Sequence, residues 1–78
     1  MNMSYQEKFK ENLRILLDEE KLSQRRFAAF IQVNQSSISD LLLGVTTPSF
    51  KTMMKIVDHF GVSVDWLVGL SDVREPKK

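Results

Sequence analysis

Two amphipathic helical stretches joined by a corner, between Gln24 and Gly44, constrain the fold of this chain more than any other feature. Within QRRFAAFIQVNQSSISDLLLG, apolar residues lie on both sides of a break at residues 32–34, and they are Phe27, Ala28, Ile31, Val33, Ile38, Leu41 and Leu42. Their spacings of three and four place them on one face of each helix. The other face of the second helix carries short or planar hydrogen-bonding side chains, namely Gln35, Ser36, Ser39 and Asp40. Because none of these is a strong helix former, we infer that this face contacts a polar partner.

The size and composition of the chain exclude several classes of protein. Its 78 residues suffice for one small domain, in which most apolar residues are needed for the core. The absence of cysteine excludes disulfides and cysteine-based zinc or redox sites, and His59 has no companion ligands, so we expect no metal. There is no apolar run of membrane-spanning length and no signal peptide, so we expect a cytoplasmic protein without a membrane partner.

The formal net charge is only +1, so the distribution of charge says more about a partner than its total does. Basic residues concentrate in the first third of the chain and recur at Lys51 and Lys55. Acidic residues concentrate at residues 18–20 and toward the C-terminus. This pattern is compatible with a basic side and an acidic side of the domain.

Capping residues and glycines divide the chain into five expected helices and indicate no strand. Ser4 and Glu7 form a capping-box pattern, and the caps expected for the later helices are Ser23, Asn34, Ser49 and Ser63. The expected helix ends are marked by Gly44, Gly61 and Gly69. The ranges are about 5–20, 24–31, 35–43, 50–60 and 64–68, which make an all-α bundle. We place a helical domain at residues 1–70 and a polar, frayed tail at residues 71–78.

The apolar spacing also predicts the residues that face the core. In the first helix they are Phe9, Leu13, Leu16 and Leu17. In the fourth helix they are Phe50, Met53, Ile56, Val57 and Phe60, and in the fifth they are Val64 and Leu67. Ile15 falls off the first stripe, either as a lone exposed residue or as part of a contact surface.

The polar face of the helix at 35–43 has the chemistry of a DNA-reading surface. In the DNA-binding version of such a helix pair, the second helix lies in the major groove and its first residues reach base edges. Gln35 can pair with adenine N6 and N7, and Ser36 and Ser39 can donate to or accept from bases or phosphates. Asp40 can accept from cytosine N4, or it can serve to exclude wrong partners, since phosphates repel a carboxylate.

The start of the helix at 24–31 suits a phosphate. The Ser23 cap and free backbone N–H groups lie beside Arg25 and Arg26. The alternative is a capped helix with solvated arginines that binds no phosphate. The residues of this segment alone favour neither interpretation over the other.

These residues together resemble the Cro/C1-type helix-turn-helix family, also called the XRE or lambda-repressor-like family. The resemblance covers LSQRRFAAFIQVNQSSISDLLLG and PSFKTMMKIVDHFGVSVDWLVG, nearly the whole helical chain. Its marks are Leu22-Ser23-Gln24, the pair Gln35-Ser36, Pro48-Ser49 and Phe60-Gly61-Val62-Ser63. The resemblance implies a five-helix lambda-repressor-like bundle that regulates transcription, as a phage, prophage or bacterial repressor. It also implies double-stranded operator DNA as partner and a homodimer at least on that DNA.

The resemblance also assigns roles to single residues. Gln24 lies where the family holds a phosphate, and the base-reading positions are Gln35, Ser36, Ser39 and Asp40. Further residues expected to contact or position phosphates are Arg25, Asn34, Thr46, Ser49 and Lys51. The candidates for a dimer contact are Val64, Trp66 and Leu70. Sealing the end of the bundle is the favoured role for Val64 and Leu67, and Trp66 fits either a core edge or an interface.

The chain departs from the family pattern at three places. Gln32 stands where the turn usually has glycine, and a left-handed conformation there costs on the order of 1 kcal/mol. Leu17 and Leu42 replace a partly buried arginine–glutamate pair, and we expect them to touch, because two apolar groups can replace such a pair without loss. The loop after the third helix has few basic residues, which predicts a shallow dependence of DNA affinity on salt.

No arrangement of residues for catalysis is present. The chain has no nucleophile–base pair, glycine-rich phosphate loop or metal-ligand spacing, so we expect no enzyme activity, no cofactor and no small-molecule ligand. The alternative function is a protein–protein interaction module on the same fold, such as an anti-repressor or a partner-docking domain, with little DNA binding. It would dock a regulator either through the helix-turn-helix surface or through apolar residues left outside the core, namely Ile15, Leu43, Met54, Trp66 and Leu70.

Overall fold

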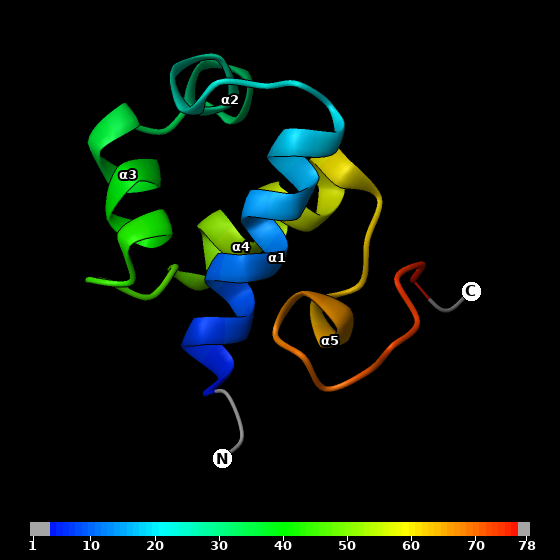
Figure 1. The fold of residues 1–78 in the computed structure, drawn as a ribbon. Helices are drawn as coiled ribbons and strands as arrows, with labels where there is room; N and C mark the ends of the chain where they lie inside the picture. The colour runs from blue at the N-terminus through cyan, green and yellow to red at the C-terminus, as the bar shows by residue number, and fades with distance from the viewer. Residues whose placement is uncertain (1–3, 77–78) are drawn as a thin grey trace.

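Five helices form the regular structure of this protein in a computed structural model that describes residues 4–76 (Figure 1). They are α1 (Tyr5–Glu19), α2 (Gln24–Ile31), α3 (Gln35–Leu43), α4 (Phe50–Phe60) and α5 (Val64–Leu67). No described residue lies in a strand, so the predicted all-α fold is confirmed. None of the helices within residues 4–76 has the length and apolar character needed to span a membrane. The domain limit at 70 stays a prediction, and residues 1–3 and 77–78 of the predicted domain and tail lie outside the described part.

Serine hydroxyls cap α1, α2, α4 and α5 as the sequence predicts. Their oxygens accept backbone N–H bonds from the residue three positions ahead, at 3.1 Å for Ser4, Ser23 and Ser49 and at 3.0 Å for Ser63. Asn34 occupies the same position before α3, but its side chain makes no capping bond, which corrects the prediction for this residue. Its exposed amide is therefore available to a partner.

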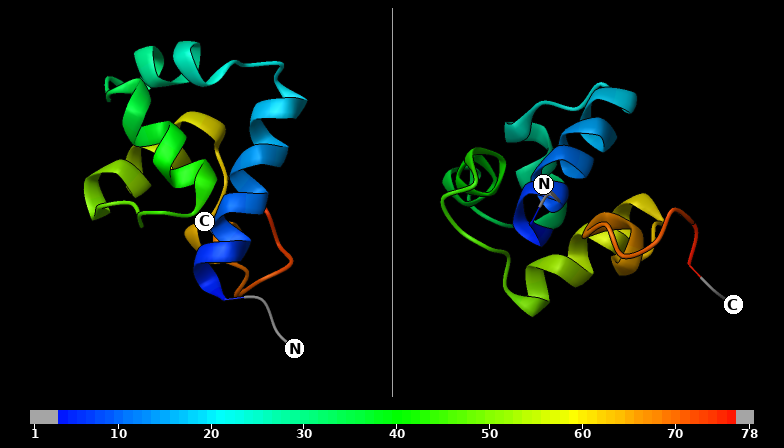
Figure 2. Two further views of the ribbon diagram at one scale, coloured as in Figure 1. Left: turned by 60° about the vertical axis from the view of Figure 1, so that its left-hand side comes forward. Right: turned by 60° about the horizontal axis from the view of Figure 1, so that its bottom comes forward.

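Helix α1 runs through the middle of the bundle, with α3 on one side and α5 on the other (Figures 1 and 2). Helix α2 contacts both α3 and α4, and α4 contacts α5. The buried residues form one cluster, made of Phe9, Leu13, Leu16, Leu17, Phe27, Ala28, Ile31, Ile38, Leu41, Leu42, Ile56, Val62 and Leu67. Leu17 and Leu42 thus lie in the same core and neither is solvated, as two apolar substitutes for an ion pair require. Their direct contact stays a prediction.

Phe50 does not face the core, which corrects the predicted face of α4. Its side chain is 79% exposed, whereas Ile56 is fully buried and Met53, Val57 and Phe60 pack partly against the core. Phe50 and Ile56 are six positions apart in the sequence. At 3.6 residues per turn, the Phe50 side chain therefore points about 120° away from the side of α4 on which Ile56 is buried. Val64 of α5 is only half-buried, so Leu67 alone of the predicted pair in α5 reaches the core.

The tail is held against the bundle as far as Arg74, so the prediction that it frays is wrong for this part. The guanidinium of Arg74 donates to both carboxylate oxygens of Glu19, one of them at 3.0 Å, and lies 4.8 Å from the centroid of the Trp66 ring. The backbone N–H of Ser63 donates to the carbonyl of Arg74 at 2.7 Å. The hydrogen bond from Arg74 lowers the pKa of the exposed Glu19 carboxyl. The sequence missed this arrangement because polar composition alone indicated a free tail.

The corner between α2 and α3 depends on a left-handed residue. Gln32 has φ 60° and ψ 50°, as expected for a position where the family has glycine. Its N–H donates to the carbonyl of Ala29 at 3.3 Å, and the next N–H, of Val33, donates to that of Ala28 at 3.0 Å. These bonds close the end of α2 and send the chain into α3.

Replacing Gln32 by glycine should stabilise the fold, because a β-carbon in this conformation costs on the order of 1 kcal/mol. We expect the free energy of unfolding to rise by about 0.5–1 kcal/mol, after the entropy that glycine adds to the unfolded chain. Chemical and thermal denaturation followed by circular dichroism measures this change. Ala29→Gly, inside α2, is the control and should lower stability by about 1 kcal/mol. Equal losses in both variants would contradict strain at Gln32.

Candidate nucleic-acid interface

The two helices of the corner present different surfaces because each is anchored by its inner face. Phe27, Ala28 and Ile31 bury one side of α2, and Ala28 is small enough for close approach of the two helices. The buried side of α3 consists of Ile38, Leu41 and Leu42. The opposite sides are consequently turned outward, and α3 cannot rotate without exposing its core residues.

The predicted base-reading residues occupy the outer face of α3. Gln35 and Ser36, in its first turn, are exposed, and Ser39 and Asp40, one turn later, are half-buried. Within residues 4–76 none of these four side chains forms a hydrogen bond. Their donors and acceptors are therefore free for a partner, and the first turn of α3 is the most accessible part of this face.

Part of the predicted phosphate set comes together between the end of α3 and the start of α4. A hollow of about 240 Å³ there is lined by Asp40, Thr46, Ser49 and, among others, Ser37 and Thr52. Ser37 and Thr52 were not among the predicted residues, because only the packing of the loop at residues 44–49 against α3 brings them to this place. The hollow is rich in hydroxyl groups, and Asp40 is its only charged lining residue.

Ser49 is already engaged within the protein. Its hydroxyl donates to Thr52 Oγ1 at 3.1 Å and accepts the Thr52 N–H at 3.1 Å. Phe50 and Lys51 lie between Ser49 and Thr52 in the first turn of α4. Their backbone N–H groups have no partner within the described residues. Backbone N–H groups and the exposed Lys51 are thus the donors available at this helix start.

The remaining positioning candidates lie on other elements. Gln24 is half-buried and Arg25 exposed in the first turn of α2, and Asn34 is exposed just before α3. Gln24 and Arg25 lie in the turn that Ser23 caps, so free N–H groups, an amide and a guanidinium gather at the start of α2. Such a group of donors is suited to an anion.

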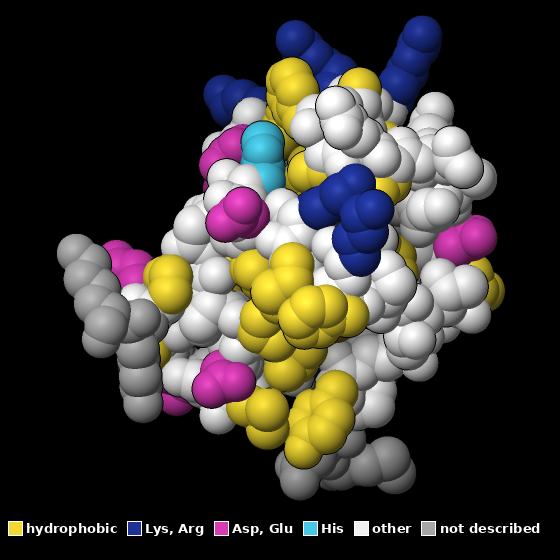
Figure 3. Space-filling view, turned by 180° about the vertical axis from the view of Figure 1, so that it is seen from behind, with side chains coloured by type: hydrophobic (Ala, Val, Ile, Leu, Met, Phe, Trp, Pro, Cys, Tyr) yellow, Lys and Arg dark blue, Asp and Glu magenta, His cyan; other side chains and the backbone are white. Residues whose placement is uncertain are grey.

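Residues of the tail lie against two of the three predicted dimer residues. Trp66 is half-buried beneath Arg74, and Val64 lines a hollow that the tail residues Val73 and Pro76 also line, whereas Leu70 is 61% exposed. A more continuous apolar surface lies on α4. We call Phe50, Met54 and Val57 the α4 apolar face; together with Lys51, Lys55 and Asp58 they line a hollow of about 520 Å³. Figure 3 shows hydrophobic side chains gathered at the centre of one side of the molecule, with basic and acidic side chains around them.

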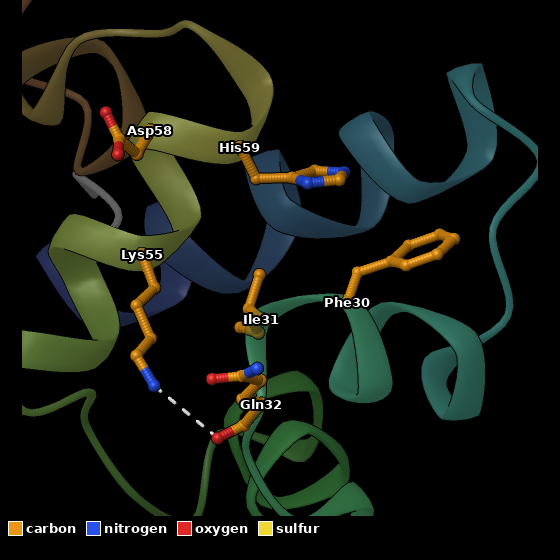
Figure 4. A pocket seen from close by; sticks show the side chains of 6 residues that line it. All are labelled: Phe30, Ile31, Gln32, Lys55, Asp58 and His59. Atoms are coloured by element: carbon orange, nitrogen blue, oxygen red, sulfur yellow. Dashed lines mark hydrogen bonds between the residues drawn. The ribbon is translucent and has the colours of Figure 1, made fainter.

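His59 belongs to an aromatic cluster, of which Figure 4 shows the His59 ring on α4 facing the Phe30 ring on α2. Its ring stacks on Phe30 at 5.9 Å and meets Phe27 and Phe60 edge-on at 5.5 and 4.8 Å. Its Nε2 lies 3.9 Å from a carboxylate oxygen of Glu20. Across residues 4–76 no group of three histidine, aspartate or glutamate side chains is arranged to hold a metal ion. The arrangement of His59 is accounted for by packing between α2 and α4.

Comparison with protein families identifies the arrangement of α2 and α3 as a helix-turn-helix. A family model described as helix-turn-helix matches residues 13–67, which is more than half of the chain and extends from α1 to the end of α5. Neither the curated proteins nor the solved structures yielded a match.

Proposed function

We propose a specific role in reading DNA, on the premise that the chain belongs to the Cro/C1-type helix-turn-helix family. Membership makes it a DNA-binding helix-turn-helix regulator. Our proposal is that it is a sequence-specific repressor of phage or bacterial origin, acting in the cytoplasm with α3 in the major groove. The observation that carries it is the first turn of α3, where Gln35 and Ser36 are exposed on a helix locked in place by Ile38, Leu41 and Leu42.

The proposed reading of bases follows the order of residues along α3. Gln35 reaches deepest and pairs with adenine through its amide, while Ser36 and Ser39 complete the contact with hydroxyl donors and acceptors. Asp40 lies further along, at the hollow near Thr46. A carboxylate there repels phosphate and accepts only from a base such as cytosine, so it narrows the choice of sequence.

Phosphates on either side of the groove would be held at two helix starts. One contact uses Gln24 and Arg25 at α2, and the other uses the free N–H groups of Phe50 and Lys51 at α4. Thr46, in the loop before α4, and the exposed Asn34, directly before α3, would add polar contacts. Arg25, Arg26 and Lys51 are the cations nearest in sequence to these contacts. Three neutralised phosphates predict a slope of log affinity against log salt of about −3 for each protomer.

We further propose that two copies bind a palindromic site through the α4 apolar face. Phe50 directly follows the loop that borders the DNA contact, so a partner copy seated there would approach the two-fold axis of the site. Lys51, Lys55 and Asp58 border the same hollow and can pair with their opposites on the second copy. Trp66 is covered by Arg74 and is less accessible, and Leu70 is left as the competing candidate.

One observation favours the second candidate function, a module that docks another protein. Leu43 and Val45 are 67% and 66% exposed, directly after the proposed reading surface. A DNA-facing loop gains more from basic or amide side chains than from these apolar ones. Under this alternative the apolar loop would form the contact, and α3 would read no bases.

The substitution Gln35→Ala separates the two functions. Wild type should bind at least one fragment of the neighbouring genomic DNA above non-specific background, and the variant should lose about 1–3 kcal/mol of discrimination at one base pair. Fluorescence anisotropy at two salt concentrations measures both effects. Arg25→Ala is the matched control, since it should weaken binding to all sequences alike and reduce the salt slope by about one.

Two results would count against this assignment in different ways. If wild type bound no fragment at low salt, the docking function would be favoured. If Gln35→Ala kept the sequence preference of wild type, α3 would not read DNA through this residue.

The dimer is tested with Phe50→Ser and Leu70→Ser, which both remove an exposed apolar side chain and should leave the fold intact. We expect Phe50→Ser to raise the dissociation constant of the dimer at least about tenfold, because a buried phenylalanine contributes roughly 1.5–3 kcal/mol. Sedimentation equilibrium with and without palindromic DNA measures it. A loss confined to Leu70→Ser would place the contact at the end of α5 instead.

A further inference from the structure

Helix α1 carries three polar side chains at intervals of four, Gln6, Lys10 and Arg14, which places them in one row on its surface. The row lies along the C-terminal end of α3. Arg14 Nη2 donates to the carbonyl of Leu42 at 3.2 Å. Gln6 Nε2 donates to the carbonyl of Gly44 at 2.7 Å and to that of Thr46 at 3.3 Å. The Lys10 side chain packs against Gly44, with its Nζ 3.7 Å from the place of an added β-carbon.

This row satisfies groups that a helix end leaves unpaired. The last carbonyls of a helix have no partner inside it, and the end carries a partial negative charge. In α3 the carbonyl of Asp40 accepts from Val45 N–H at 3.1 Å, and that of Leu41 accepts from Gly44 N–H at 3.3 Å. The carbonyls of Leu42, Gly44 and Thr46 depend on side chains of α1 instead. The positive charge of Arg14 also compensates the helix dipole, whereas that of Lys10 is partly offset by Glu7, whose carboxylate lies 3.5 Å from the Lys10 Nζ.

The loop after α3 has few other restraints. Val45, Thr46 and Thr47 are exposed, so burial of apolar surface contributes little to their position. Within the described residues, the two hydrogen bonds of Gln6 are the only ones that a side chain from another helix makes to residues 44–47. They connect positions 38 and 40 residues apart in the chain.

We propose that Gln6 is a positioning residue for DNA recognition, and that the row of Gln6, Lys10 and Arg14 sets the end of α3 and the loop at residues 44–47 for contact with the DNA. The proposal rests on the function proposed above. Gln6 acts through Thr46, whose side chain lines the hollow with Asp40 and Ser49. Both N–H groups of the Gln6 amide donate to carbonyls inside the protein, so Gln6 has no donor left for the DNA and acts only through the loop.

The test compares Gln6→Met with Gln6→Lys in the full chain. Methionine has the same reach but no donor, so we expect operator affinity to fall about 3–10-fold, as the loss of one or two hydrogen bonds implies. Lysine restores an N–H donor, so we expect the ratio of specific to non-specific affinity to return to that of wild type. The added positive charge strengthens both affinities alike and leaves their ratio unchanged. In the free protein, the amide NMR signals of residues 44–47 should shift in the methionine variant and return toward wild type in the lysine variant.

Lys8→Met is the matched control, because Lys8 packs on the other side of α1, against Gly69 after α5. It should change neither the loop signals nor the affinity. The proposal is overturned if wild type binds operator DNA and Gln6→Met binds it equally well, or if Lys8→Met produces the same loss. If wild type itself binds no DNA fragment, the proposed function fails first and the positioning role fails with it.

Discussion

The packing of α1 between α3 and α5 determines where the rest of the molecule lies. Its apolar side, with Phe9, Leu13, Leu16 and Leu17, forms the part of the core that reaches both neighbours. Within the described residues Asn12 is the one buried polar side chain, and it donates to the carbonyls of Trp66 at 2.9 Å and Leu67 at 3.3 Å. Helix α5 has four residues and is too short to be stable alone. The amide of Asn12 therefore adds a tertiary restraint at its end, beside the backbone bond that Gly69 N–H donates to the Trp66 carbonyl at 3.0 Å.

The helices could be predicted from the sequence because caps and stops act over a few residues. Ser49 and Gly61 bound α4 where they were expected, and the left-handed Gln32 followed from its place at the corner. Contacts between distant segments were beyond such reasoning. No local pattern predicts a role for the Asn12 and Gln6 amides, and only the approach of α5 and of the loop at residues 44–47 gives them partners. Phe50 was misassigned because spacing within α4 does not tell which direction the bundle occupies.

For the candidate site, the exposed face of α3 could be predicted from apolar spacing, whereas the bonds made by the polar side chains around it could not. Gln35 and Ser36 are exposed, as the spacing predicts, and their role in base reading stays a proposal. Ser49 bonds to Thr52 within its own helix turn, so a phosphate at this place would depend on backbone N–H groups. Leucine at positions 17 and 42 keeps this part of the core apolar. At the surface above it, Arg14 of α1 donates to the backbone carbonyl of Leu42 at the end of α3, a contact that apolar spacing does not predict.

The two ends of α3 differ in the chemistry of their exposed side chains. Its first turn is polar and free, whereas its last turn leads into exposed apolar residues at Leu43, Val45 and Phe50. A single module of this size contacts roughly 600–1,000 Å² of DNA-facing surface, which limits how well one copy can select a site. Joining two copies through apolar surface beyond the reading end would multiply that selectivity without adding charge. For the proposed dimer, near-neutral net charge would be an advantage, because weak non-specific attraction to DNA would leave the base contacts of the two copies to decide where the protein binds.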